Sequence, residues 1–157
     1  FASQRGYSFY FLGAYPGVSR AAADQIVRRY PTLKIAGTHH GYFQKSPGHP
    51  QNEAVLRDIN RTRPSILILG MGMPMQEKWL LDNWDRLDCN VAMTGGAVFD
   101  YLSGNLRRAP RWMNDHSLEW LGRLIIEPRR LWRRYMVGNP TFLARVLRQR
   151  LTSDAGR

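Results

Sequence analysis

Short apolar runs alternate with amphipathic segments along the first two thirds of this 157-residue chain. Apolar runs that end at a glycine or a glycine-bearing turn predict strands at residues 7–13, 33–37, 65–70 and 90–95. Apolar positions at helical spacing predict helices at residues 18–30, 52–62 and 75–87. Continuous apolar strands that alternate with helices are typical of a parallel sheet covered on both faces. The expected fold class is therefore α/β, with a Rossmann-like parallel sheet flanked by helices.

The pattern changes after residue 104, where the chain reads as entirely helical. The run "HSLEWLGRLIIEPRRLWRRYMVGNP" at 116–140 holds five arginines and two tryptophans beside an apolar stripe. Glu127 and Pro128 interrupt this stripe, and proline suits the first position of a helix, so two successive helices are predicted. The chain is expected to divide into a Rossmann-like part at 1–104 and an all-helical basic appendage at 105–157.

Charge is concentrated in this appendage. The chain carries a net charge of +11; residues 105–157 hold 12 Lys and Arg against 4 Asp and Glu, whereas residues 1–104 hold 11 against 8. Such asymmetry indicates an anionic partner, which could be a phosphorylated ligand, an anionic membrane or a nucleic acid. Because no apolar run reaches the roughly 20 residues that span a bilayer, a soluble or peripheral protein is expected. The single cysteine, Cys89, favours a reducing, cytosolic compartment.

Each predicted strand ends in a glycine-bearing turn, and in a parallel sheet these turns share one edge, where ligands bind. The turns read "LGAYPG", "AGTHHGYF", "LGMGMP" and "TGGAVFD". Glycine lets backbone N–H groups approach a phosphate, although a glycine after a strand can also serve only as a tight turn. No GxGxxG or Walker sequence is present. The candidate binding residues of these turns are Gly13, Thr38, Gly70, Gly95 and Gly96.

Three further side chains carry chemistry suited to a nucleoside. Tyr42 can stack on a base, and Gln76, in the first turn of a predicted helix, can read a base edge or a sugar hydroxyl. Asp100 follows two glycines and suits ribose hydroxyls, with a solvated helix residue as the alternative. His39 and His40 are adjacent, but they should point to opposite sides of an extended chain, and no His or Cys cluster supports a metal site.

Four segments together resemble one family of bacterial enzymes. They are "GTHHGYF", "GMGMPMQEKW", "TGGAVFDYLSGNLRRAP" and "LEWLGRLIIEPRRLWRRYMVGNP", and they occur in the family's order. On these motifs the chain resembles the WecG/TagA/CpsF glycosyltransferases, glycosyltransferase family 26, from about residue 8 to residue 143.

The resemblance implies an inverting hexosyltransferase that needs no metal or other cofactor. Such an enzyme moves an N-acetylmannosamine-type or related hexose from a UDP-sugar to a polyprenyl-diphosphate-linked acceptor during synthesis of teichoic acid or another envelope polysaccharide. Residues 1–104 would then bind the UDP-sugar. The appendage would dock on the anionic inner face of the cell membrane and fold over the active site, which implies a cytoplasmic, peripheral protein.

The resemblance also implies roles for individual residues. It places Tyr42 against the uracil, Gln76 in the turn lining the nucleotide pocket, and Asp100 on the uridine. Arg123, Arg130 and Arg133 match the motif positions of arginines that stabilise the leaving diphosphate. A guanidinium can take up that negative charge where other enzymes use a metal.

The family's general base, an aspartate, falls upstream of the first strand of this chain. The chain is therefore expected to be part of a longer protein and to have little transferase activity alone. Two alternatives stay open: a catalytically idle, membrane-anchored binding module, and a basic nucleic-acid-binding protein. No groove-reading motif supports the second, so nucleic acid is not an expected partner. Oligomeric state is left open, a homo-oligomer included.

Overall fold

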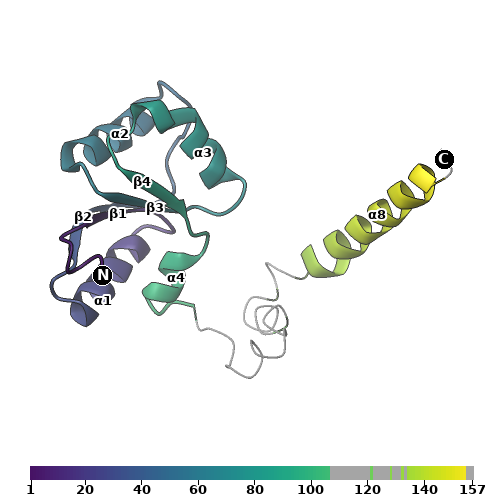
Figure 1. Cartoon of the computed structure of the whole chain (residues 1–157), viewed down its shortest axis with the longest axis horizontal. Coiled ribbons are helices and arrows are strands. Elements are labelled where there is room, and N and C mark those ends of the chain that lie inside the picture. Colours follow the sequence, from purple (N-terminus) through teal and green to yellow (C-terminus); the bar gives the residue numbers. More distant parts are fainter. Residues whose placement is uncertain (107–120, 122–127, 129–131, 133, 155–157) are drawn as a thin grey trace. The chain divides into compact units, whose positions relative to one another are not determined.

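The computed structural model describes residues 1–106, 121, 128, 132 and 134–154. The chain forms two compact units, Phe1–Leu106 and Arg107–Arg157. Strands and helices alternate through the first unit, which confirms the predicted Rossmann-like α/β class (Figure 1). In chain order its elements are β1 (Ser8–Gly13), α1 (Val18–Arg29), β2 (Lys34–His39), α2 (Pro50–Thr62), β3 (Ile66–Gly70), α3 (Met75–Asn83), the 3₁₀ turn η1 (Trp84–Arg86), β4 (Val91–Thr94) and α4 (Val98–Leu102).

The boundaries differ from the predictions at one strand and two helices. Strand β2 runs to His39, two residues beyond the predicted end, so Thr38 lies in the strand and not in the turn after it. Helix α2 begins at Pro50, two residues before the predicted start, because the His49 side chain accepts a hydrogen bond from the Gln51 N–H and proline suits the first turn. The segment predicted as one helix to residue 87 is α3 followed by η1, which tightens the last turn. Helix α4 was not predicted.

Within the described residues, four strands form a parallel sheet in the order β2-β1-β3-β4. Two apolar clusters cover its two faces, one beneath α2 and α3 and the other beneath α1 and α4 (Figure 1). The neighbouring strands β1 and β3 thus continue into helices on opposite faces, α1 and α3. In such sheets the crevice for a ligand opens at the carboxyl ends of these two strands.

The apolar clusters contain the residues that the strand and helix patterns place inside. Beneath α2 and α3 lie Tyr10, Leu12, Val55, Leu56, Ile59, Leu67, Leu69 and Trp79. Beneath α1 and α4 lie Phe11, Ala22, Ala23 and Phe99. Burying one large apolar side chain stabilises a fold by roughly 1.5–3 kcal/mol, so these clusters hold the helices on the sheet.

A β-bulge in β2 changes the face of the sheet on which the following side chains of that strand lie. Phe9 pairs with Ile35 but Tyr10 pairs with Gly37, which leaves Ala36 as an extra residue. A Cβ on Gly37 would lie 2.5 Å from the Tyr10 ring, so glycine is required where that ring crosses β2. The bulge brings Thr38 opposite Phe11, on the face that α1 covers.

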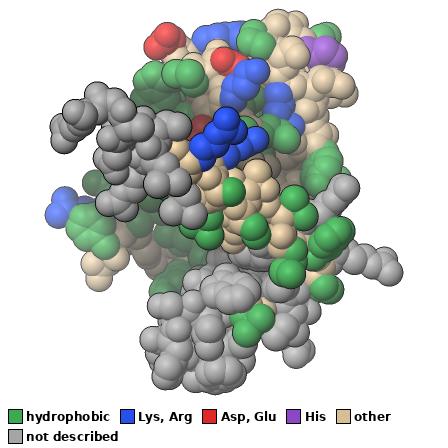
Figure 2. Space-filling view, turned by 90° about the vertical axis from the view of Figure 1, so that its right-hand side faces the viewer, with side chains coloured by type: hydrophobic (Ala, Val, Ile, Leu, Met, Phe, Trp, Pro, Cys, Tyr) green, Lys and Arg blue, Asp and Glu red, His purple; other side chains and the backbone are tan. Residues whose placement is uncertain are grey.

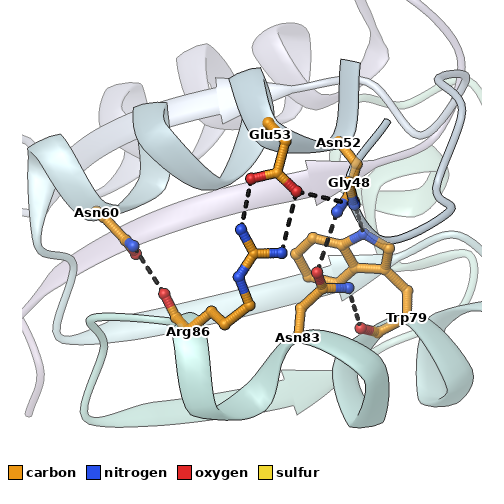
Figure 3. A network of polar contacts seen from close by, with 7 residues as sticks. All are labelled: Gly48, Asn52, Glu53, Asn60, Trp79, Asn83 and Arg86. Atoms are coloured by element: carbon orange, nitrogen blue, oxygen red, sulfur yellow. Dashed lines mark hydrogen bonds and ion pairs between the residues drawn. The ribbon is translucent and has the colours of Figure 1, made fainter. Parts of the chain in front are cut away.

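A buried polar network fixes α3 against α2 (Figure 3). The Trp79 indole N–H donates to the Asn52 Oδ1 (2.7 Å), the Asn52 Nδ2 donates to the Asn83 Oδ1 (3.0 Å), and the Asn83 Nδ2 donates to the Trp79 carbonyl (2.8 Å). Beside it, Arg86 forms an ion pair with Glu53. Because the buried donors and acceptors bond one another, the network specifies one orientation of α3.

The second unit is helical where it is described. A π-helical turn, η2 (Arg134–Gly138), leads into α8 (Asn139–Asp154). The predicted pair of helices at 116–140 lies largely outside the described residues. Of the helices that the structure describes, none combines the length and apolar character needed to cross a membrane.

The asparagine network generates a stability prediction. Replacing Asn83 with alanine leaves the buried Asn52 amide without its acceptor, and we expect a loss of about 2 kcal/mol in the free energy of unfolding. Urea unfolding measures the loss. Asn90→Ala is the control, because Asn90 is exposed. Equal stability of the two variants would contradict a structural role for the network.

Candidate functional site

The turns after the first three strands join at one edge of the sheet. Gly13 and Gly70, the last residues of β1 and β3, are direct neighbours in the sheet. The Ala14 N–H donates to the Gly70 carbonyl (2.8 Å), and the Gly41 N–H, beyond β2, donates to the Ala14 carbonyl (2.9 Å). The predicted meeting of the strand ends therefore rests on direct backbone contacts.

Two glycines permit this approach because a side chain at either would collide with its neighbour. A Cβ at Gly13 would lie 2.3 Å from the Gly70 carbonyl oxygen. A Cβ at Gly70 would lie 2.6 Å from the Phe99 ring and 3.0 Å from the Gly96 carbonyl oxygen. Close packing alone thus explains glycine at these positions, and it brings the turn after β4 against the other three.

The turn after β4 is held from two sides. The Gly95 N–H donates to the Leu69 carbonyl (2.7 Å), and the Gly96 N–H donates to the Gln76 Oε1 (3.2 Å). Gln76 is only 3% exposed. This predicted binding residue is therefore buried next to the turn, and its amide oxygen accepts the Gly96 N–H.

Asp100 lies in α4, directly after this turn. The preceding residue, Phe99, is fully buried, and its ring centroid lies 5.0 Å from that of Phe11. Because Phe99 anchors the short helix to the sheet, Asp100 has a defined place at the same edge, where it is partly buried.

Tyr42 projects from the turn after β2 and stacks on Tyr15 from the turn after β1. The ring centroids are 4.4 Å apart and the planes are inclined by 20°. Tyr42 and Tyr15 are 56% and 62% exposed, respectively. Exposed aromatic faces at a ligand edge suit a planar base. Tyr15 was not predicted, because nothing in "LGAYPG" indicates which ring it would meet.

The two adjacent histidines lie side by side, so the prediction that they point to opposite sides is wrong. Their ring centroids are 4.5 Å apart, because His40 lies beyond the end of β2, where the alternation of the strand no longer applies. The His40 Nδ1 accepts the Tyr42 N–H (3.2 Å). Burial lowers the pKa of His40, and the nearby His39 and Lys45 lower it further. These causes favour the neutral form of His40.

Lys45 holds the turn that carries Tyr42. Its Nζ donates to the carbonyls of Gly41 (2.5 Å) and Phe43 (3.1 Å) and lies 4.5 Å from the centroid of the Phe43 ring. Burial lowers the pKa of Lys45. In the part of the chain that the structure describes, no three His, Cys, Asp or Glu side chains group as metal ligands.

Thr38 lies in β2 and lines a groove between α1 and β2. The groove has a volume of about 500 Å³ and includes Arg20 and Arg28 among its lining residues. Of the other predicted site residues in the described part of the chain, Gly13, Gly70, Gly95, Gly96 and Gln76 are joined by the contacts above. Tyr42 lies in the turn after β2, and Asp100 lies in α4. Arg123, Arg130 and Arg133 lie outside the described residues.

Comparison with known proteins gives a family and several relatives. Residues 1–156 match the model of the glycosyl transferase WecG/TagA/CpsF family. The N-acetylglucosaminyldiphosphoundecaprenol N-acetyl-beta-D-mannosaminyltransferase of Bacillus subtilis (strain 168) is 33% identical over 148 residues, which cover 94% of this chain and 55% of that protein. The enzyme of the same name from Staphylococcus aureus (strain MRSA252) is 31% identical over 124 residues, 79% of this chain and 46% of its own length. The chain spans about half the length of the curated relatives it matches.

The close approach of β1 and β3 generates a prediction about glycine. Both Gly13 and Gly17 have positive φ, but a Cβ at Gly17 meets nothing within 4 Å. We expect Gly13→Ala to lower the free energy of unfolding by about 3 kcal/mol or more, through collision with the Gly70 carbonyl. Gly17→Ala should cost only about 1 kcal/mol of backbone strain. Denaturant unfolding of both variants makes the comparison, and equal losses would show that backbone conformation alone requires Gly13.

Proposed function

The chain belongs to the WecG/TagA/CpsF family of glycosyltransferases, and from this membership we propose that it supplies the donor-binding part of a hexosyltransferase. The proposed reaction moves an N-acetylmannosamine-type hexose from a UDP-sugar to a polyprenyl-diphosphate-linked acceptor. The names of the Bacillus and Staphylococcus relatives state a transfer of N-acetylmannosamine to a GlcNAc-diphosphoundecaprenol, which supports this acceptor class. The product would enter a teichoic acid or another envelope polysaccharide.

One observation supports the proposed donor site: backbone hydrogen bonds and close packing join the turns after all four strands at the carboxyl edge of the sheet. Tyr42 follows β2 and Asp100 follows β4, so both come from segments at this edge. We assign Tyr42 to the uracil, by stacking, and Asp100 to the ribose hydroxyls, by hydrogen bonds. The turns at Gly13, Gly70, Gly95 and Gly96 would line the diphosphate; because the Gly95 and Gly96 N–H groups donate to Leu69 and Gln76, the N-termini of the helices that follow the strands would supply the favourable charge.

The proposed chemistry is an inverting displacement. The acceptor hydroxyl forms a bond to the anomeric carbon on the face opposite UDP, the bond from that carbon to the diphosphate oxygen breaks, and the electron pair leaves with UDP. The hydroxyl proton passes to a general base, which we do not assign within this chain. We propose that Arg123, Arg130 and Arg133 stabilise the leaving diphosphate, on the basis of their positions in the basic C-terminal motif.

We also propose that the second unit binds an anionic membrane surface, at the inner face of the cell membrane. Helix α8 contains three arginines and one aspartate, and Phe142, Leu143 and Val146 on it are exposed. Figure 2 shows Lys and Arg side chains and hydrophobic side chains among those exposed on one face of the molecule. Arginine for lipid phosphates and exposed apolar side chains for the acyl boundary are the two components of interfacial binding.

The donor site is tested by calorimetric titration of the chain with UDP. We expect UDP to bind more tightly than ADP, and Asp100→Asn to weaken UDP binding about tenfold through loss of a charged hydrogen-bond acceptor. Tyr42→Ala should weaken it by a similar factor through lost stacking. Tyr30→Ala is the control, because Tyr30 is an exposed tyrosine at the end of α1, just before β2 begins. Equal affinity for UDP and ADP, unchanged by Asp100→Asn, would refute a uridine site.

Vesicle sedimentation tests the membrane proposal with the full chain. Each Lys or Arg near an anionic surface contributes about 1 kcal/mol, so binding should be strong at low salt and should weaken as salt screens the charges. The double variant Phe142→Ser with Leu143→Ser should lose most of the binding that persists at high salt. Leu81→Ser, which removes an exposed leucine from α3, is the control. Equal high-salt binding by the two variants would exclude α8 as the apolar contact.

A further inference from the structure

The amide of Gln76 has a defined orientation because both of its ends are bonded. Its Oε1 accepts the Gly96 N–H (3.2 Å), and its Nε2 donates to the Glu77 Oε1 (2.7 Å). A flipped amide would place an NH₂ group against the Gly96 N–H and an oxygen against the Glu77 carboxylate. Both contacts would then be repulsive, so the two partners specify the same orientation.

The bond to Gly96 is one of several contacts that hold this turn. Gly96 has a left-handed φ of 55°, its carbonyl oxygen packs close to Gly70, and the Gly95 carbonyl accepts the Val98 N–H (3.1 Å). Gly95 is bonded to β3 through the Leu69 carbonyl. The Gln76 oxygen is therefore the contact through which α3 holds the second glycine.

Helix α3 is a fixed support for this contact. Trp79, one turn after Gln76, is tied to Asn52 of α2 and to Asn83 in the buried network (Figure 3). A path of hydrogen bonds and packing thus runs from α2 through α3 to the Gly95–Gly96 turn, and Asp100 follows that turn in α4.

We infer that Glu77 is a positioning residue of the donor site: it orients the Gln76 amide, whose oxygen holds the Gly95–Gly96 turn in the conformation that receives the nucleotide. This inference rests on the proposed function, and it assigns Gln76 a role through Gly96 rather than through direct contact with a base. It also gives Glu77 a task beyond favourable interaction with the helix N-terminus.

The inference predicts that removing Glu77 weakens UDP binding, whereas loss of its negative charge alone would strengthen it. UDP is an anion, so removing the nearby negative charge of Glu77 should by Coulomb attraction tighten its binding. If Glu77 orients Gln76, removing it should weaken binding instead, because the Gly96 N–H loses its fixed acceptor. Glu77→Ala therefore separates the two effects.

The test uses calorimetry with UDP on the full chain and on three variants. We expect Glu77→Ala to weaken UDP binding about fivefold and Gln76→Met, of similar shape but apolar, to weaken it about fivefold to tenfold. Asp82→Ala is the matched control, because it removes the same charge from an exposed position of α3. It should leave the affinity equal or slightly higher.

Hydrogen exchange of the Gly96 amide, followed by NMR in the unliganded chain, provides the readout that a general loss of stability does not mimic. Exchange should become faster at Gly96 in Glu77→Ala and Gln76→Met, and it should be unchanged at the Gly95 amide. Unchanged Gly96 exchange, or Glu77→Ala affinity equal to or tighter than that of the unaltered chain, would overturn the inference. If the unaltered chain binds no UDP, the proposed function fails, and the positioning role fails with it.

Discussion

The contact between Gly13 and Gly70 is the constraint on which the rest of the site depends. With no Cβ on either residue, the ends of β1 and β3 come close enough for the Ala14 N–H to reach the Gly70 carbonyl. Gly41 then bonds to Ala14, and Gly96 lies over Gly70. A side chain at either of the first two positions would separate these turns, and the polar groups of the edge would no longer form one surface.

The helices on the two faces of the sheet fix the positions of individual side chains at this edge. Phe99 holds α4 on one face and thereby places Asp100, while Trp79 and its asparagine partners hold α3 on the other face and thereby place Gln76. The aromatic pair of Tyr15 and Tyr42 remains exposed above the edge. A rigid support beneath exposed binding groups lowers the entropy lost when a ligand is ordered.

Features that depend on the local sequence pattern could be predicted from the sequence. Features that depend on contacts between residues far apart in the chain could not. The strands, three of the helices and the edge where their turns meet follow from apolar runs and glycines, which report on short-range geometry. The bulge at Ala36, the stack of Tyr15 on Tyr42 and the burial of Gln76 depend on residues far away in the chain. Helix α4 was missed because five residues carry too little periodicity, and its stability comes from Phe99 packing on Phe11.

The central claim is that the joined strand-end turns are one nucleotide-binding surface. Backbone NMR spectra of the chain, recorded during titration with UDP, test it most directly, because every turn contributes its own amide signals. The account predicts shifts at Ala14, Gly41, Tyr42, Gly95 and Gly96, together with contacts between uracil protons and the Tyr42 ring. Shifts confined to the groove between α1 and β2, or spread evenly over the chain, would contradict it.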